Sequence, residues 1–207
     1  MSLFSETVDT FASNFKTKDM KKIALTYGLI AGTVVSAFML FSMNYLSHCN
    51  GDVDYGTSMA VGYASMLIAF SLVFVGIKNY RDNHNGGIIS FGKAFKVGLF
   101  ISLIASTMYV VAWLIDFFYF IPDFIDKYSA HMLAELRASG ASQVKIAAKA
   151  SEIASFAVQY RNPFFTAIMT YAEILPVGLV VTLISSLILK RQPVADEKDL
   201  STEIHNL

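Results

Sequence analysis

The sequence predicts an all-α, polytopic membrane protein with four transmembrane helices, an N-terminal amphipathic helix and an outer two-helix insertion. The first observation behind this is composition, because 55% of the 207 residues are hydrophobic and only 15% are charged, whereas soluble domains carry about a quarter charged residues. The second is the presence of four apolar runs, each about as long as the roughly 20 residues that a helix needs to cross a bilayer. The third is that basic residues gather on one side of these runs.

The four predicted spans cover residues 24–46, 57–77, 97–115 and 164–189. A spanning segment must pair its own backbone groups, so each run is expected to be a helix. The first three runs are uncharged and the fourth contains one acid, Glu173. No linker or internal repeat divides them, so residues 21–191 are predicted to form one transmembrane domain, followed by an acidic tail over 192–207.

The segment before the first span, residues 1–20, is predicted to be a separate amphipathic helix. Phe4, Val8, Phe11 and Phe15 recur at helical spacing. Such a helix is expected to lie on the membrane surface with its phenylalanines at the acyl boundary. The alternative is a partly frayed tail.

The distribution of Lys and Arg predicts the orientation. The N-terminal segment, the loop between the second and third spans and the C-terminal tail hold eleven of these residues, against five on the other side. Both termini and the central loop are therefore expected to face the cytoplasm. The aromatic residues that end the third span, followed by Pro122, are typical of an interface at its outer end.

The insertion over 123–162 is the largest segment outside the spans. Phe124, Tyr128, Met132 and Leu136 recur every four residues, and a second apolar stripe runs from Ile146 to Tyr160. Gly140 interrupts the pattern, and Ser142 is placed to cap the second helix. We expect two amphipathic helices packed on the outer mouth of the bundle or on the leaflet.

Each span also contains small residues at four-residue spacing, which permit close helix packing in lipid. These rows predict a compact bundle, in preference to a dedicated dimer face. The rows are Gly28, Gly32 and Ser36; Gly56, Ala60 and Ala64; Gly98, Ser102 and Ser106; and Gly178, Thr182 and Ser186.

Glu173 is the sharpest candidate for a functional residue. An acid near the middle of a span costs about 3 kcal/mol, and such groups often mark a functional path. Pro176 follows three residues later and is expected to kink the helix beside the acid. The pair suits a proton- or cation-coupled site, but a plain hydrogen bond from Glu173 to a hydroxyl group across the bundle is an equal alternative.

The central loop is the second candidate. Lys78, Arg81, Lys93 and Lys96 flank it and are expected to contact anionic headgroups of the inner leaflet. Gly86 and Gly87 are typical of a turn and could form an anion-binding nest, although no nucleotide-binding pattern surrounds them. Ser90 is placed to cap the third span. Topology anchoring and lipid contact are the favoured interpretation.

No catalytic arrangement of side chains is evident, and no cofactor or metal is expected. The loop over 48–54 mixes His48, Cys49, Asn50 and two aspartates, which are too few and too loosely placed for a metal site. Because Cys49 is the single cysteine, no internal disulfide can form. The sixteen basic and sixteen acidic residues cancel, so no nucleic-acid partner is expected.

Two motifs resemble those of a bacterial family of four-helix inner-membrane proteins catalogued as a domain of unknown function. One is Y-R-D followed by G-G-I-I-S-F-G-K-A-F-K-V-G, over residues 80–98. The other is E-I-L-P-V-G-L over 173–179, continued by L-I-S-S-L-I-L-K-R over 183–191. The resemblance covers about 21–191 and implies a location in the bacterial cytoplasmic membrane. It supplies no activity, substrate or catalytic residue.

These observations favour a non-enzymatic accessory or scaffold subunit of an envelope complex. Its expected partners are the bilayer and its anionic headgroups, together with another membrane or envelope protein or a second copy of the chain. The alternative is a small transporter or lipid-handling permease that uses Glu173 and the bend at Pro176.

Overall fold

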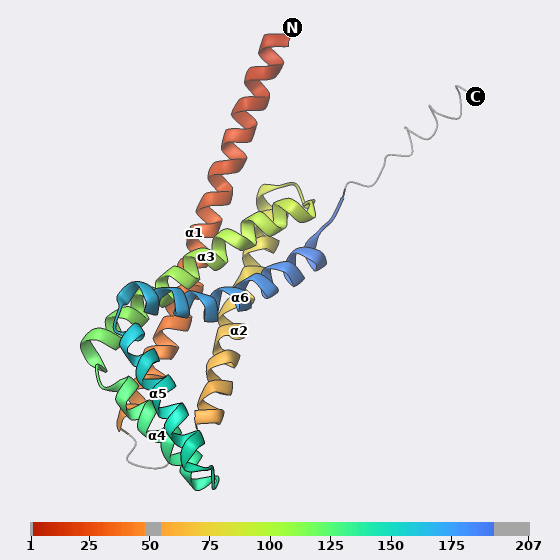
Figure 1. The fold of residues 1–207 in the computed structure, drawn as a ribbon. Coiled ribbons are helices and arrows are strands. Elements are labelled where there is room, and N and C mark those ends of the chain that lie inside the picture. The colour runs from red at the N-terminus through yellow and green to blue at the C-terminus, as the bar shows by residue number, and fades with distance from the viewer. Residues whose placement is uncertain (1, 49–54, 193–207) are drawn as a thin grey trace.

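The computed structural model describes residues 2–48 and 55–192, with side chains described over 18–43 and 59–192. The described residues form helices and contain no β-strand, which confirms the all-α fold (Figure 1). The elements are α1 (Ser2–His48), α2 (Tyr55–Asn79), the π-helical turn η1 (Tyr80–His84), α3 (Phe91–Ile115), the π-helical turn η2 (Asp116–Phe120), α4 (Phe124–Ala138), α5 (Gln143–Tyr160) and α6 (Pro163–Leu189).

Four of the described helical stretches are long and apolar enough to cross a membrane, namely Lys18–Met43, Met59–His84, Phe91–Phe120 and Pro163–Leu189. The chain is therefore a multi-pass membrane protein, as the sequence predicts. The third span starts at Phe91, six residues before its predicted limit at 97. Helix α3 begins directly after Ser90 and includes Lys93 and Lys96. Below, the end of the bundle that carries these lysines is called the basic end, and the opposite end is called the hairpin end.

Helix α1 differs from the prediction of a separate surface helix over 1–20. It runs without a break from Ser2 to His48, and its first part extends past the rest of the bundle (Figure 1). The physical reason is that no glycine or proline occurs before Gly28, so nothing interrupts the helix before the span. The side chains of the predicted phenylalanine stripe lie outside those described.

Helix α3 is the centre of the bundle. It packs against α1 and α6, and α2 contacts α1, α3 and α6. The side chains between them include fully buried Phe70, Ile77, Ile101 and Ile174. Since lipid provides little hydrophobic force between helices, the closeness of this packing must supply the stability.

Three of the four predicted rows of small residues lie at helix contacts. A methyl group added to Gly28 would lie 2.8 Å from Ile104 Cβ, and one added to Gly98 would lie 2.8 Å from Thr182 Cγ2. Buried Ser102 forms a hydrogen bond with the Thr182 hydroxyl at 2.9 Å. Helices α1 and α6 therefore each approach α3 as closely as the rows predict.

The prediction that the row of small residues on the second span forms a packing face is wrong. Ala60 and Ala64 are exposed, and the side-chain position of Gly56 lies outside the described part. Helix α2 instead packs through the face that carries Met66, Phe70 and Ile77. Its close contact is made by Gly76, where an added methyl group would lie 2.6 Å from Ile101 Cδ1.

Helices α4 and α5 form the predicted insertion as an antiparallel hairpin at the end of the bundle opposite the N-terminus (Figure 1). Gly140 joins them with a φ of +73°, a left-handed conformation that suits glycine. The Ser142 hydroxyl accepts a hydrogen bond from Lys145 N at 3.4 Å, so it caps α5 as predicted. Among all residues of the hairpin only Ile146 is buried.

Candidate functional site

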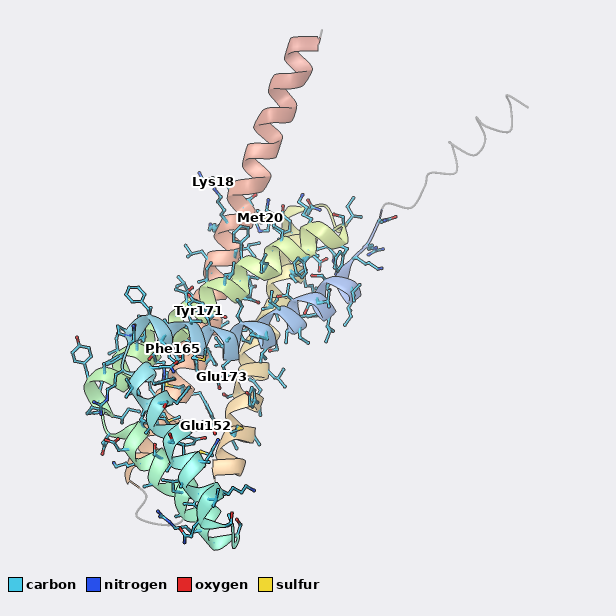
Figure 2. All side chains as sticks on the ribbon, viewed as in Figure 1. Lys18, Met20, Glu152, Phe165, Tyr171 and Glu173 are labelled. Atoms are coloured by element: carbon cyan, nitrogen blue, oxygen red, sulfur yellow. The ribbon has the colours of Figure 1, made fainter. Side chains whose placement is uncertain are left out.

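Glu173 lies on α6, inside the fourth span (Figure 2). It lies ten positions after Pro163 at the start of the helix, which corresponds to about 15 Å at the rise of an α-helix. Glu173 is exposed as a residue, as are Met169, Ala172, Pro176 and Val180. These five residues form one side of α6, called the Glu173 face below.

Other side chains surround this acid without pairing with it. Its carboxylate interacts electrostatically with Tyr109 of α3 and with Tyr160 at the end of α5. Within residues 18–43 and 59–192, however, no hydrogen bond or ion pair is formed by Glu173. The predicted hydrogen bond to a hydroxyl group across the bundle is therefore not among the contacts of the described residues.

Pro176 adds a second acceptor to the Glu173 face. Helix α6 continues through this proline to Leu189. Because proline has no N–H group, the carbonyl of Ala172 lacks the donor that it would otherwise have four residues later. The face thus combines a carboxylate with a backbone carbonyl to which residue 176 supplies no N–H donor, at a depth where water is scarce.

The two pockets that are described lie elsewhere. One, of about 430 Å³, is formed between α4 and α5 and is lined by residues such as Tyr128, Met132 and Phe156. The other, of about 180 Å³, lies at the base of the hairpin beside Phe117 and Arg161. Glu173 lines neither of them, so the acid belongs to a surface and not to either pocket.

The base of the hairpin is fixed by an aromatic and polar cluster. Buried Trp113 of α3 donates a hydrogen bond from Nε1 to the Tyr160 hydroxyl at 3.2 Å. The Tyr160 ring packs edge-on against Phe117, with centroids 5.2 Å apart. Burial raises the pKa of Tyr160 above its ordinary value, so this hydroxyl stays protonated at neutral pH. These contacts join α5 to the end of α3.

Replacing Tyr160 with phenylalanine is expected to loosen this junction. The change keeps the ring but leaves the buried indole N–H of Trp113 without its acceptor, which costs about 1 kcal/mol. Because Trp113 is the single tryptophan, its fluorescence reports the site directly. We expect a shifted emission maximum and a lower unfolding midpoint in detergent. Tyr119→Phe, which changes a tyrosine that is 80% exposed, is the control and should leave the emission unchanged.

Asp116 is a further candidate, which spacing along the sequence does not single out. It lies within η2, is 8% exposed, and has one carboxyl oxygen without a hydrogen-bond partner among the described residues. The available signal was an acid placed between the apolar run V-V-A-W-L-I and the aromatic run F-F-Y-F. A buried acid in a π-helical turn is a feature often found at functional positions.

The four cations of the central loop do not all face outward. Lys78 and Lys96 are exposed, as expected for contact with headgroups. Arg81 instead forms an ion pair with Asp82 at 2.6 Å and donates to the Leu189 carbonyl at the end of α6, at 3.4 Å. Lys93 donates to Asn85 Oδ1 at 2.8 Å. Arg81 and Lys93 thus make contacts within the protein, which sequence spacing alone does not reveal, and their predicted contact with headgroups stays a prediction.

Gly86 and Gly87 form the predicted turn. Their φ angles are +68° and +78°, which a residue with a side chain rarely adopts. The Gly87 N–H donates to the Arg81 carbonyl at 2.9 Å. The turn therefore closes back on the π-helical turn η1, and this glycine pair has a structural role whether or not it also binds an anion.

The turn leads to a short clasp between the central loop and the end of α6. Ile89 N donates to Arg191 O at 2.9 Å, and Arg191 N donates to Ile89 O at 2.8 Å. The Ile89 side chain is 1% exposed. The two sequence motifs over 80–98 and 183–191 therefore meet, and backbone hydrogen bonds between them hold the basic end of the bundle together.

Replacing Arg191 with proline is expected to open this clasp. Proline removes the N–H that bonds to Ile89 O, at a cost of about 1–3 kcal/mol for the carbonyl left unpaired. The preceding Lys190 already has φ −54° and ψ 130°, a conformation that suits a residue before proline. Arg191→Ala removes the charge but keeps the N–H, so it should retain most of the stability. Unfolding in a denaturing detergent compares the two variants, and equal losses would contradict the role of the backbone bond.

The loop over 48–54, weighed above as a metal site, lies outside the described part, apart from the helical backbone of His48. In the part of the chain that is described, no group of three or more His, Cys, Asp or Glu side chains is placed to hold a metal ion.

The model of one protein family matches residues 26–191, which is most of the chain. This family is described as "Protein of unknown function (DUF4199)". The chain belongs to the DUF4199 family. No curated protein and no solved structure matches the chain. Membership in DUF4199 agrees with the resemblance carried by the two motifs. Both motifs fall inside the matched segment, and the clasp and the Glu173 face are therefore parts of the DUF4199 domain.

Proposed function

We propose that the chain is a non-enzymatic accessory or scaffold subunit of a bacterial envelope complex. In this proposal it lies in the cytoplasmic membrane with both termini and the basic end in the cytoplasm, following the distribution of Lys and Arg. The observation that carries the proposal is the α4–α5 hairpin. It is attached at its base and presents a largely uncovered surface at the hairpin end.

The exposed side chains of the hairpin support this role. Val144 and Val158 of α5 are 81% and 72% exposed, and Phe156 is also exposed. Val144 and Val158 fall on the same side of α5, so in this proposal they contribute to one apolar contact with a protein or a membrane. A pocket of about 430 Å³ between the two helices adds a concave surface to the same element.

The way the hairpin is held also favours presentation of a surface. The contacts of Trp113 and Phe117 with Tyr160 fix its base. The Phe124 ring packs edge-on against Trp113 with centroids 5.5 Å apart. An element anchored in this way can bind a partner without first being ordered, which lowers the entropy cost of binding.

The second candidate is a small transporter or a lipid-handling permease. It is favoured by one observation, the unpaired Glu173 beside Pro176 inside a span. Such an activity requires a path of polar space to the acid, and the two described pockets lie away from it. The test is proton or cation flux into vesicles that contain the purified protein. If flux occurs and Glu173→Gln abolishes it, a transport function would replace the accessory role.

The accessory role is tested by a charge placed on the hairpin. Val158→Lys is expected to remove a companion protein from the complex extracted with mild detergent, since burying the new lysine against an apolar partner is costly. Asn83→Lys changes an exposed polar position at the opposite, basic end of the bundle and is the control. The native mass of each extracted complex is the readout. A companion that stays bound in full amount to the Val158→Lys protein would contradict the proposal.

A further inference from the structure

The Glu173 face has features that the hairpin does not explain. It exposes Glu173 on the side of the fourth span where Tyr109 and Tyr160 lie nearby, next to the carbonyl of Ala172, to which Pro176 supplies no N–H donor. We propose that this face is the seat for a transmembrane helix of a different protein, which carries a basic side chain at the same depth. The inference rests on the accessory role proposed above and names the contact inside the membrane.

The first step is that both acceptors need a donor. Hydrocarbon supplies none, and acids within spans are usually paired with another side chain or face a polar cavity. No hydrogen bond or ion pair of Glu173 exists within residues 18–43 and 59–192, although Tyr109 and Tyr160 lie within electrostatic reach. A cationic donor from outside the chain would satisfy the carboxylate and the carbonyl together.

The second step concerns depth. Glu173 lies about 15 Å along α6 from Pro163 at the hairpin end. Since the hydrocarbon core is about 30 Å thick, this depth is close to its middle, far from the headgroups of either leaflet. An amine of a lipid headgroup is therefore a poor partner, whereas a side chain of a spanning helix reaches this depth naturally.

The third step excludes a second copy as the source of the cation. The sequence has no Lys or Arg between Lys22 and Lys78, or between Arg161 and Lys190. The cations at or beyond the ends of the third span, Lys93, Lys96 and Lys127, also lie outside its apolar part. A second copy would thus offer no basic residue at mid-membrane depth. Two copies related by a two-fold axis through this face would place Glu173 against Glu173, which is unfavourable for two ionised acids.

The fourth step is that a helix can approach this face closely. Ala172 and Pro176 flank Glu173 and are short, and all three are exposed. Small residues allow backbones to come together in lipid, where close contact supplies the attraction. The longer side chains of Met169 and Val180, which are 38% and 55% exposed, mark the two ends of the seat.

Site-specific cross-linking in the native membrane tests the seat. The photoreactive amino acid p-benzoylphenylalanine is placed in the full chain at Met169 or Val180 on the Glu173 face. The controls are Val111 and Ile115, which are 50% and 49% exposed on α3. We expect an adduct with one other protein from the two α6 positions and not from the controls. The cross-linked peptide should belong to a spanning helix that contains Lys, Arg or His.

Variants at position 173 then test the charge. Glu173→Asp should keep the adduct, and Glu173→Lys should reduce its yield more than ten-fold through repulsion of the partner's cation. Glu173→Leu, which removes the charge and suits lipid, should reduce the yield similarly, with an unchanged unfolding midpoint in detergent as the check on folding. An adduct with a second copy, adducts with lipid alone, a yield unchanged by Glu173→Lys and Glu173→Leu, or a partner helix without a basic residue would each overturn the inference. If any of these results is found while a companion protein is still co-extracted, only the proposed contact at the Glu173 face is refuted. If no companion is present, the accessory role is refuted as well.

Discussion

Replacing Gly178 with leucine is expected to destabilise the bundle more than any other single change considered. Gly178 lies where α6 meets α2 and α3. A methyl group at this position would already lie 2.9 Å from the Phe70 ring and 3.1 Å from Ser102 Cβ. A leucine must therefore push α6 away from both helices, and the Ser102 hydroxyl would lose its bond to the Gly178 carbonyl, now 3.2 Å long. The expected loss is about 3 kcal/mol.

The unfolding midpoint in a denaturing detergent measures this loss, and Gly62→Leu is the matched control. Gly62 also lies within a span, but a methyl group there would meet no atom within 4 Å. The control should change stability by less than about 0.5 kcal/mol, as is usual for a substitution at an open position. Similar losses for the two variants would show that helix packing at Gly178 does not hold the bundle together.

Deleting residues 123–162 is expected to remove companion proteins entirely while leaving the four spans assembled. The spans pack through α1, α2, α3 and α6, and within the hairpin only Ile146 is buried. A flexible Gly/Ser linker can replace it, because contacts between Trp113 and Tyr160 show that the ends of α3 and α5 lie together. The native mass should fall to that of the shortened chain with bound lipid.

The deletion needs a test that the remaining bundle is folded. The shortened chain should keep an unfolding midpoint that is still lowered by Gly178→Leu, since that contact lies far from the removed segment. A companion that remains bound in full amount to this folded, shortened chain would remove the hairpin from the docking surface. It would leave the Glu173 face as the remaining candidate.

The sequence predicted those features that depend on local pattern. Apolar length identified the four spans, and four-residue periodicity with Gly140 and Ser142 identified the hairpin and its turn. The small residues Gly28, Gly98 and Gly178 lie at close contacts between helices, as predicted. Each of these signals acts within one helix or at one helix surface, so it can be recognised without knowing which helices are neighbours.

The sequence was less informative where distant segments decide the outcome. Arg81 and Lys93 were expected at headgroups, but the end of α6 and Asn85 supply them with partners. The row at Ala60 and Ala64 has suitable residues on a face that α2 does not use for packing. The burial of Asp116 likewise depends on how neighbouring helices cover the end of α3. Such features follow from the assembly of the bundle and not from spacing along the chain.

The most direct test of the accessory role is the native mass of the complex after gentle extraction from its own membrane, with every component identified. We expect a second protein in fixed stoichiometry with the 22.8 kDa chain, held by the hairpin and by the Glu173 face. Loss of that protein on deletion of residues 123–162 would support the hairpin as its docking surface. A monomer or homodimer that carries only lipid would contradict it and would direct attention to transport through Glu173.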